Sequence, residues 1–444
     1  MQLKDLAAID FSQRRKTFLN RSKGGVAVFL AAPQVIRNGD VHHPYRQDSN
    51  FYYLTGFEEP QSLALLAPES EKPFQIFVHP RDRNKELWEG KVSGPEVAKI
   101  TVGADEAYPS TPDNYFDEAF IAALYHAEFI YYRLGHSQKL DRRILRLMIE
   151  AQRRIGRRKY SLWPIRDPEE ILGGMRLIKS KGEIERLQTA ATLSAEAHLN
   201  AMRLAKPNMY EYEVEALLYH SFRIQGAARL GYPSIVASGP NACVLHYHAN
   251  NRKMNSGELL LVDAGGEFDY YTADITRTYP VNGRFSQEQR EVYLAVLQAQ
   301  KECIKMAKPG KTLIEIHHAA CEILTEELRK LKVLKGTTAS LLKKGAFHAF
   351  YPHGTSHWIG MDVHDSGPYF QTGINKPLKL EPGMVFSIEP GLYFSPDSNV
   401  VPPRYRGIGV RIEDDILVTP TGCKVLTAGA PKELEEVESL CSQS

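Results

Sequence analysis

The feature that most constrains the fold is the segment 259–278, LLLVDAGGEFDYYTADITRT. It begins with a short apolar block, passes two glycines, and returns through a stretch rich in Thr, Tyr and Ile. Two such runs joined by a short connection are typical of a β-hairpin. With the turn centred near Phe268 and Asp269, we expect Asp263 and Asp274 directly opposite each other on one face. A bulge at the glycines would shift this register by a residue or two.

Two carboxylates opposed on an apolar hairpin repel each other. Burying them without a partner costs several kcal/mol or forces one of them to take up a proton. One solution is local, with an arginine such as Arg277 or backbone N–H groups satisfying each aspartate. The other solution is a bound cation. The pair by itself does not decide between these two.

The length and composition of the chain restrict its class. A chain of 444 residues is too long for one ordinary core and predicts two domains. Lys and Arg total 55 and Asp and Glu total 53, so the net charge of +2 favours neither nucleic acid nor an acidic membrane surface. The five cysteines are scattered and include no Cys-x-x-Cys pair, which argues against disulfides and favours a reducing compartment. No signal core or membrane-length apolar run is seen, so we expect a cytoplasmic protein.

The first part of the chain has the pattern of an α/β domain. From residue 26 to about residue 133, β-like blocks (VAVFLA, FYYLTGF, SLALLA, FQIFVH, FIYYRL) alternate with polar or helical stretches. Residues 141–160 follow as an amphipathic helix with a basic face, for which solvation is favoured over nucleic-acid binding. The Pro- and Gly-containing segment 161–174 is typical of a connection. We therefore expect one domain over residues 1–172 and a second over residues 173–444.

Histidines are concentrated in the last third of the chain. His348, His353, His357 and His364 lie within 17 positions, among glycines and aromatic residues. A single histidine is usually structural, whereas four so close together favour a functional site.

Two glutamates in the same region belong to apolar segments. Glu389 ends the strand-like MVFSI, and Glu413 lies in GIGVRIEDDILV, two residues after Arg411 and on the same face. Buried strand glutamates are rare without a partner. With the hairpin aspartates and one imidazole, the four carboxylates could bridge two divalent ions roughly 3.5 Å apart. Such oxygen-rich ligation suits Mn(II), with Co(II), Fe(II) and Zn(II) as competitors.

The ordered motifs VDAG…ADITRT, HGTSHWIGMDVHD, SIEPGLY and VRIEDD resemble those of the pita-bread metallopeptidases, and of the aminopeptidase P family in particular. YRQDSNFYYLTGFEEP and ELWEG resemble the noncatalytic domain of that family, so the resemblance covers nearly the whole chain. It implies an α/β plus α+β fold. An N-terminal noncatalytic α/β domain would be followed by a catalytic pita-bread domain with a curved, mainly antiparallel sheet covered by helices.

The resemblance also implies a dinuclear centre. Asp263 would bind one metal, His357 and Glu389 the other, and Asp274 and Glu413 would bridge. Glu389 is also our expected proton shuttle. By the same resemblance, His246 would contact the substrate near the scissile group, and His364 would support the reacting carbonyl. His353 and Arg411 would line the pocket for the proline ring, with Tyr232 and Tyr393 as weaker matches. Trp88 would be contributed to the site by a neighbouring subunit. The last role implies a homo-oligomer, a dimer or tetramer.

The expected activity is hydrolysis of the N-terminal Xaa-Pro bond of peptides whose second residue is proline. Prolidase is the nearest alternative, because it shares the metal set but cleaves only Xaa-Pro dipeptides. A noncatalytic pita-bread binding protein is a second alternative, although such proteins typically lack the metal ligands present here. A serine hydrolase built on Ser356 is disfavoured, since GTSHW lacks the trailing glycine of a nucleophile elbow.

Overall fold

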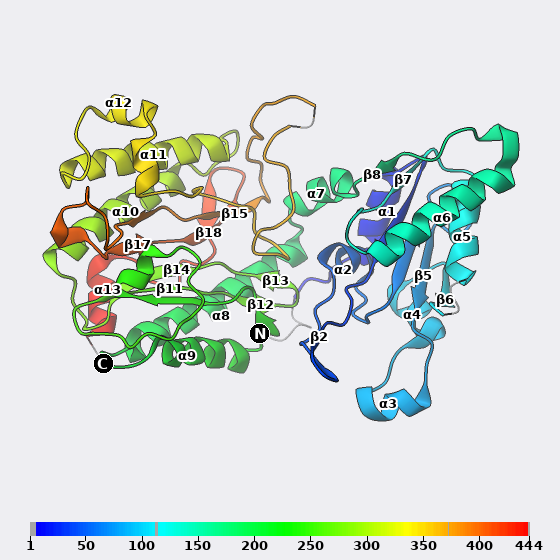
Figure 1. Cartoon of the computed structure of the whole chain (residues 1–444), viewed down its shortest axis with the longest axis horizontal. Helices are drawn as coiled ribbons and strands as arrows, with labels where there is room; N and C mark the ends of the chain where they lie inside the picture. Colours follow the sequence, from blue (N-terminus) through cyan, green and yellow to red (C-terminus); the bar gives the residue numbers. More distant parts are fainter. Residues whose placement is uncertain (1–5, 112–113, 372, 443–444) are drawn as a thin grey trace. The chain divides into compact units, whose positions relative to one another are not determined.

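The chain forms two compact units in the computed structural model, which describes residues 6–111, 114–371 and 373–442. The N-terminal unit is Ile9–Met175, and the C-terminal unit is Met1–Ala8 with Arg176–Ser444 (Figure 1). Among the described residues, no helix is both long and apolar enough to span a bilayer. The functional division at residues 172 and 173 stays a prediction.

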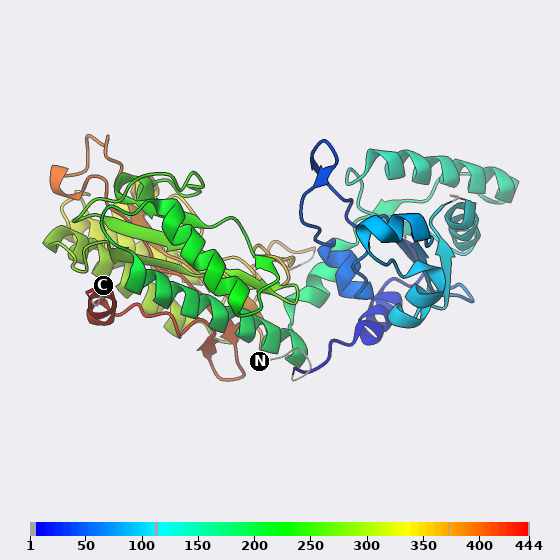
Figure 2. The same ribbon diagram turned by 90° about the horizontal axis from the view of Figure 1, so that it is seen from below.

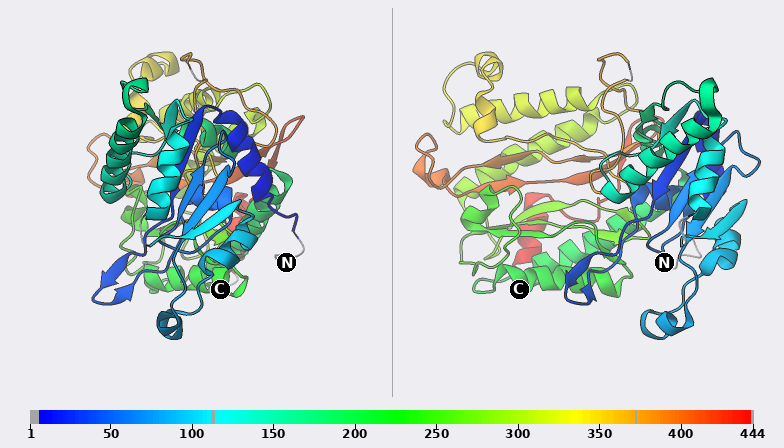
Figure 3. Two further views of the ribbon diagram at one scale, coloured as in Figure 1. Left: turned by 90° about the vertical axis from the view of Figure 1, so that its right-hand side faces the viewer. Right: turned by 45° about the vertical axis from the view of Figure 1, so that its right-hand side comes forward.

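The N-terminal unit is built on a six-stranded mixed sheet of order β6-β5-β4-β1-β7-β8, with β1 antiparallel to β4 and parallel to β7. Side chains alternate along β1, so that Val26 and Val28 join the core with α5 and α6 while Phe29 packs against Phe18 of α1. Figure 3 (left) shows these helices on opposite sides of the sheet. The strands are β1 (Gly25–Leu30), β2 (Ile36–Asn38), β3 (Val41–His42), β4 (Leu63–Leu66), β5 (Phe74–Val78), β6 (Glu106–Pro109), β7 (Phe129–Tyr131) and β8 (Ile165–Arg166). The helices are α1 (Phe11–Arg21), α2 (Ser49–Thr55), α3 (Arg83–Glu89), α4 (Gly94–Val102), α5 (Asn114–Leu124), α6 (Gln138–Ile155) and α7 (Glu169–Leu177).

One of the expected β-like blocks of this unit is wrong. The block FYYLTGF lies largely in α2 and not in a strand. The Asp48 side chain accepts a hydrogen bond of 2.8 Å from the Phe51 N–H and caps the start of the helix. Gly56 ends the helix in the left-handed conformation, with φ of 66°. Capping at both ends therefore outweighs the β propensity of the aromatic residues between them.

The expected basic helix is present as α6, which begins after Ser137 and ends before Gly156. The expected end at residue 160 is wrong, because the short 3₁₀ helix Gly156–Arg158 follows α6. The arginines of α6 form ion pairs with acidic residues of α5: Arg143 contacts Asp117 at 2.7 Å, and Arg154 contacts Glu118 at 2.8 Å. Part of the basic face is therefore neutralised within the unit.

All strand pairs among the described residues of the C-terminal unit are antiparallel, and they form small sheets of two or three strands. Helices α8 and α9 pack on each other and on β9, β10, β12 and β13, while α10 and α11 form a second pair, with α10 against β15, β16 and β17. Figure 1 shows one pair below and the other above the strands, and Figure 2 shows α8 and α9 side by side. The strands are β9 (Arg229–Leu230), β10 (Ile235–Ser238), β11 (Leu259–Asp263), β12 (Gly266–Phe268), β13 (Tyr271–Thr272), β14 (Thr276–Pro280), β15 (Val385–Ile388), β16 (Gly391–Tyr393), β17 (Gly409–Arg411), β18 (Asp414–Val418) and β19 (Cys423–Val425). The helices are α8 (Lys181–Leu204), α9 (Glu211–Ile224), α10 (Gln287–Met306), α11 (Leu313–Lys330), α12 (Thr338–Lys343) and α13 (Leu434–Cys441).

The hairpin is present, but the expected register is wrong. Asp263 at the end of β11 faces Thr276 of β14, not Asp274. The turn falls one residue later than expected, at Asp269 and Tyr270, whose φ angles are 46° and 71°. Moving the turn by one residue moves every cross-strand partner by two, which keeps each side chain on the same face. Asp274 therefore lies two residues before the partner of Asp263, in the break between β13 and β14.

Candidate metal centre

A pocket of about 430 Å³ in the C-terminal unit collects most of the residues singled out from the sequence. This volume suits a small ligand or part of a peptide. The pocket is lined by all five expected metal ligands, Asp263, Asp274, His357, Glu389 and Glu413, and by His246, His353, His364, Arg411 and Tyr232. Tyr393 is adjacent, in contact with His353 and Arg411.

The carboxylates reach the pocket from strand ends and from breaks between strands. Asp263 ends β11, Glu389 directly follows β15, and Glu413 lies between β17 and β18. His357 is tied to β15 by paired bonds: its N–H donates to the Ser387 hydroxyl at 3.0 Å, and its carbonyl accepts from the Ser387 N–H at 2.9 Å. Strand ends can place a polar side chain in the pocket while the apolar residues before it stay in the core.

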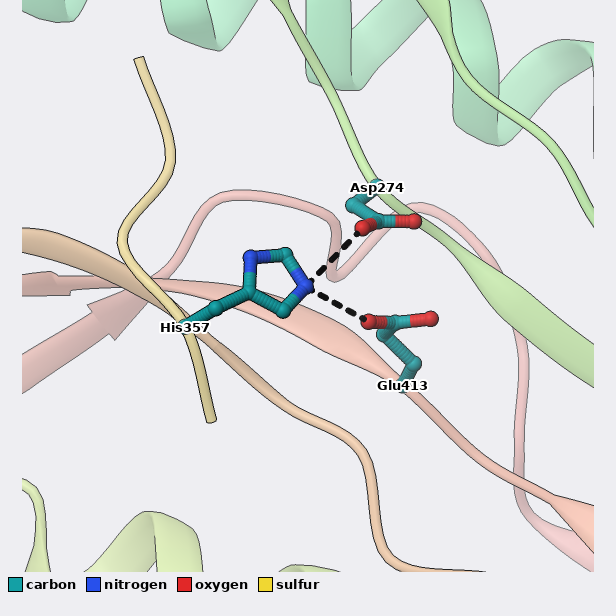
Figure 4. Close-up of side chains that lie close together, drawn as sticks. All are labelled: Asp274, His357 and Glu413. Carbon is teal, nitrogen blue, oxygen red and sulfur yellow. Dashed lines mark ion pairs between the residues drawn. The ribbon is translucent and has the colours of Figure 1, made fainter. Parts of the chain in front are cut away.

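The imidazole of His357 is the point around which the acids gather. Its Nε2 lies 3.4 Å from Asp274 Oδ2, 3.4 Å from Glu389 Oε1 and 4.0 Å from Glu413 Oε1. Figure 4 shows Asp274 and Glu413 pointing toward this nitrogen from two different segments. One ligand atom from each of Asp274, His357 and Glu413 lies within 4.8 Å of the others, so these three side chains could hold a metal ion.

The excess of negative charge perturbs the titration of these groups. Burial, reinforced by the neighbouring carboxylates, raises the pKa of Glu389 to about 7 and raises the pKa of Glu413 well above its usual value. Burial opposes charging of His357, yet the hydrogen bond with Asp274 and the surrounding acids raise its pKa to about 9. The same hydrogen bond lowers the pKa of Asp274 in spite of its burial. The cluster therefore attracts positive charge.

Asp263 is held by two donors. The Tyr232 hydroxyl donates to its Oδ1 at 2.7 Å, and Arg411 Nη2 donates to its Oδ2 at 2.5 Å. Tyr232 also contacts Asp274 at 2.5 Å and so links the two aspartates. Arg277 does not neutralise the hairpin aspartates, so this prediction is wrong. Its guanidinium pairs with Asp414 and with backbone carbonyls instead.

Two contacts that the sequence analysis missed orient the bridging candidates. The Thr276 hydroxyl donates to Glu413 Oε2 at 2.6 Å, and the Asp274 N–H donates to Asp415 Oδ2 at 3.0 Å. Thr276 and Asp415 stand within two residues of the motif acids, so a search of the motif flanks for polar residues would have found both. Metal sites generally depend on such supporting partners.

A chain of hydrogen bonds lies beside the acids. His353 Nδ1 donates to the Gly354 carbonyl at 2.7 Å, since a carbonyl oxygen can only accept. Burial, reinforced by the charge of Arg411, lowers the pKa of His353 to about 3. With Nδ1 donating to Gly354, the neutral ring has Nε2 free of a proton, and this atom accepts from the Tyr393 hydroxyl at 2.9 Å. Tyr393 in turn accepts from Arg411 Nη1 at 3.0 Å. This chain fixes an uncharged imidazole and an aromatic ring on one wall.

Two exposed histidines, His246 and His364, lie at the pocket. The His364 ring meets the ring of His357 edge to face, with centroids 4.4 Å apart. Burial, with the nearby His357, lowers the pKa of His364. His248 also lines the pocket and stacks near His246, at 6.4 Å between centroids. His248 was not predicted from the sequence, although its spacing of two residues from His246 could have indicated it.

Trp88 is placed differently from the other candidates. It belongs to α3 of the N-terminal unit, and 86% of its surface is exposed. It is not among the described residues that line the pocket. Its expected role in the site of a neighbouring subunit stays a prediction.

Comparison with known proteins agrees with this geometry. The model of metallopeptidase family M24 matches residues 185–420, and the model of the aminopeptidase P N-terminal domain matches residues 11–127. The chain therefore belongs to metallopeptidase family M24, and within that family to the aminopeptidase P group. The predicted fold class and family are confirmed, as is the assignment to hydrolases.

Relatives and solved structures cover almost the whole chain. The Xaa-Pro aminopeptidase of Haemophilus influenzae is 41% identical, over 97% of this chain and 96% of the relative. The Xaa-Pro aminopeptidase of Escherichia coli is 38% identical, over 99% and 98%. The structure of Pseudomonas aeruginosa aminopeptidase PepP has a TM-score of 0.92 and 40% identity, covering 99% of this chain and 98% of that one. These likenesses favour the Xaa-Pro aminopeptidase interpretation over prolidase and over a noncatalytic binding protein.

The side chains present fit a bound divalent cation. Four carboxylates and one imidazole offer oxygen-rich ligation, and Arg411 is the only fixed cation among the residues that line the described pocket. An M24 metallopeptidase with this acidic group is expected to bind divalent metal.

Proposed function

We propose that this protein hydrolyses the N-terminal Xaa-Pro bond of peptides with two divalent ions, most favourably Mn(II). In this proposal Asp263 holds one ion, His357 and Glu389 hold the other, and Asp274 and Glu413 contact both. The observation that carries the proposal is the convergence of three ligand atoms within 4.8 Å, in a pocket that the other two carboxylates also line. Divalent ions there would lower the pKa of a water molecule and offset negative charge on the reacting carbonyl oxygen.

Glu389 is the proposed proton carrier. Its carboxylate would take the proton of the attacking water and deliver it to the proline nitrogen that leaves. A general acid and base must lie within reach of the proton that it moves, and Glu389 lines the pocket with its Oε1 3.4 Å from His357 Nε2. The neighbouring Thr355 carbonyl accepts a bond of 2.9 Å from the Glu389 N–H, which holds the backbone of this residue.

The remaining pocket residues would orient the substrate. His364 is proposed to stabilise the developing oxyanion, and His246 to contact the substrate near the scissile group. Proline has no N–H at the scissile bond, so its recognition must rest on shape and apolar contact. The neutral ring of His353 and the ring of Tyr393, both fixed through Arg411, supply such a surface.

We also propose a homo-oligomer in a cytoplasmic setting. Leu87 and Trp88 of α3 are 83% and 86% exposed, and adjacent exposed apolar side chains of this size favour contact with another protein surface. All five cysteines lie in the described part of the chain and none is in a disulfide there, which suits a reducing compartment. Light scattering of the native protein tests the homo-oligomer, which requires a mass above that of one chain. If Trp88 contributes to the site of a neighbouring subunit, Trp88→Ala should have lower peptidase activity than the native protein.

The test of the activity uses metal-loaded protein and three peptides. With Mn(II), we expect cleavage of an Xaa-Pro-Pro tripeptide after its first residue and no cleavage of a matched Xaa-Ala-Pro tripeptide. An Xaa-Pro dipeptide measures the prolidase alternative. Product analysis by mass spectrometry identifies which bond is broken. Cleavage of the dipeptide alone would overturn the aminopeptidase proposal, and no cleavage of any peptide would favour a noncatalytic protein.

A further inference from the structure

A buried carboxylate outside the pocket gathers an unusual number of hydrogen bonds. Glu211 is the first residue of α9, and its relative exposure is 0%. Its Oε1 accepts from the Ser238 N–H at 2.7 Å, the Ser238 hydroxyl at 2.7 Å and the Asn241 side-chain amide at 3.1 Å. Its Oε2 accepts from the Tyr247 hydroxyl at 2.7 Å and the Arg252 N–H at 2.9 Å.

These donors share one location in the chain. Ser238 ends β10, and the other three residues follow it before β11: Asn241 in the 3₁₀ helix Gly239–Cys243, and Tyr247 and Arg252 in the segment after that helix. The segment after the helix belongs to no strand, so bonds from its side chains and N–H groups to a buried acceptor help to fix it. Glu211 therefore fixes the link between β10 and β11 at its start, at its middle and near its end.

The middle anchor is the informative one. Tyr247 reaches Glu211, while His246, the residue before it, is exposed and lines the pocket. His246 lies in a turn and is joined to Tyr247 by one planar peptide unit, so the bond that holds Tyr247 to Glu211 also restricts the backbone that carries His246.

We propose that Glu211 is a positioning residue that holds His246 in its working orientation at the pocket. This proposal rests on the proposed function, because it assigns Glu211 a part in the same reaction. Glu211 itself lines no part of the described pocket and touches no reacting atom. Its effect on the reaction must therefore pass through His246.

The test variant is Glu211→Gln, which keeps the size of the side chain and one acceptor oxygen. With that oxygen turned toward Ser238 and Asn241, the new amide NH₂ faces the Arg252 N–H, and two donors then oppose each other. The segment should shift while the helix stays intact. We expect kcat for an Xaa-Pro-Pro peptide to fall roughly tenfold with KM changed less than about twofold, since small misplacements of an orienting group mainly affect the transition state.

The matched control is Glu213→Gln, the same chemical change on the same helix. Glu213 is exposed and its Oε2 accepts only the Tyr210 N–H at 2.6 Å among the described contacts, as part of a capping box that glutamine also satisfies. We expect native kcat for this variant.

Tyr247→Phe removes the middle anchor alone and should reproduce most of the loss seen in Glu211→Gln. Native kcat for Tyr247→Phe would contradict the proposal.

The decisive measurement repeats the change in a His246→Ala background. If Glu211 acts through His246, Glu211→Gln should lower kcat less than about twofold there, because the group it positions is gone. An equal tenfold loss in both backgrounds, or native kcat in the single variant, would overturn the proposal. Metal content and Tm of each variant are measured in parallel, and loss of bound metal by Glu211→Gln would also overturn it. Failure of the unaltered protein to cleave the peptide would instead refute the proposed function.

Discussion

Removal of one hydroxyl group tests whether the metal centre depends on its supporting contacts. Thr276 of β14 is fully buried, and its hydroxyl donates to Glu413 Oε2 at 2.6 Å while it accepts from Arg411 Nε at 3.1 Å. Thr276→Val keeps the branched shape that suits a strand and deletes only this group. In the proposed centre Glu413 binds metal as a carboxylate, so the lost bond is one that stabilises its charged form.

The size of the effect follows from the kind of bond that is lost. A hydrogen bond to a charged group contributes about 1.5–3 kcal/mol, which corresponds to roughly 10- to 100-fold in a dissociation constant. Burial already raises the pKa of Glu413, so without the hydroxyl donor the carboxyl holds its proton more strongly against the metal. We therefore expect Mn(II) to bind Thr276→Val about 10- to 100-fold more weakly than the native protein.

Calorimetric titration of the metal-free protein with Mn(II) measures this change, and Thr278→Val is its control. Thr278 lies two residues further along β14 and is equally buried, but its hydroxyl bonds only the backbone of Arg411, at 3.0 Å to the carbonyl and 3.2 Å from the N–H. The Thr278→Val variant should lose about 1 kcal/mol of stability and keep native affinity for Mn(II). Native affinity of Thr276→Val for Mn(II), or an equal loss of Mn(II) affinity in the two variants, would refute the reasoning.

Two further predictions concern the acids themselves. Asp274→Ala and Glu413→Ala should each abolish turnover and lower the bound metal by at least one ion per chain, and normal activity with full metal content by mass spectrometry would remove the bridging role. Relative to Glu389→Gln, the metal-free native protein should lose stability as the pH rises from about 4.5 to about 7, because burial raises the folded-state pKa of Glu389 from 4.5 to about 7 and the proton that it holds must be given up in this range. Chemical denaturation of both proteins at pH 5 and pH 8 measures this difference, and the variant removes the contribution of the other titrating groups. A native protein that gains stability relative to the variant between pH 5 and pH 8 would contradict the sign.

The identity of the site was predictable because its residues conflict with their local setting. Glu389 follows four buried strand residues, and Asp263 ends a buried strand. A carboxylate in such a place requires a partner, and that requirement can be recognised without knowing the fold. The same logic located Glu413. Because these residues also stand in motifs of one family, the sequence predicted the class of enzyme and the fold.

Local signals were less reliable where two of them competed. Residues 51–57 carry the aromatic and β-branched side chains of a strand, yet the Asp48 cap and Gly56 make most of them helical. The hairpin turn was misplaced by one residue because Asp269 and Tyr270 both adopt left-handed conformations, which is a property of Asp more than of Tyr. In both cases the decisive residue stands at the end of the element and not in its apolar pattern.

By itself, then, the sequence determined which side chains are candidates for the chemistry and which segments of the chain carry them, since both follow from burial and from order along the chain. Only the tertiary structure decided how the acids are paired. Arg411 contacts Asp263 across 148 residues of sequence, and Thr276 contacts Glu413 across 137. Arg277, the near neighbour, turns to Asp414 instead. Contacts between distant segments depend on how strands and helices pack, and no local pattern specifies them.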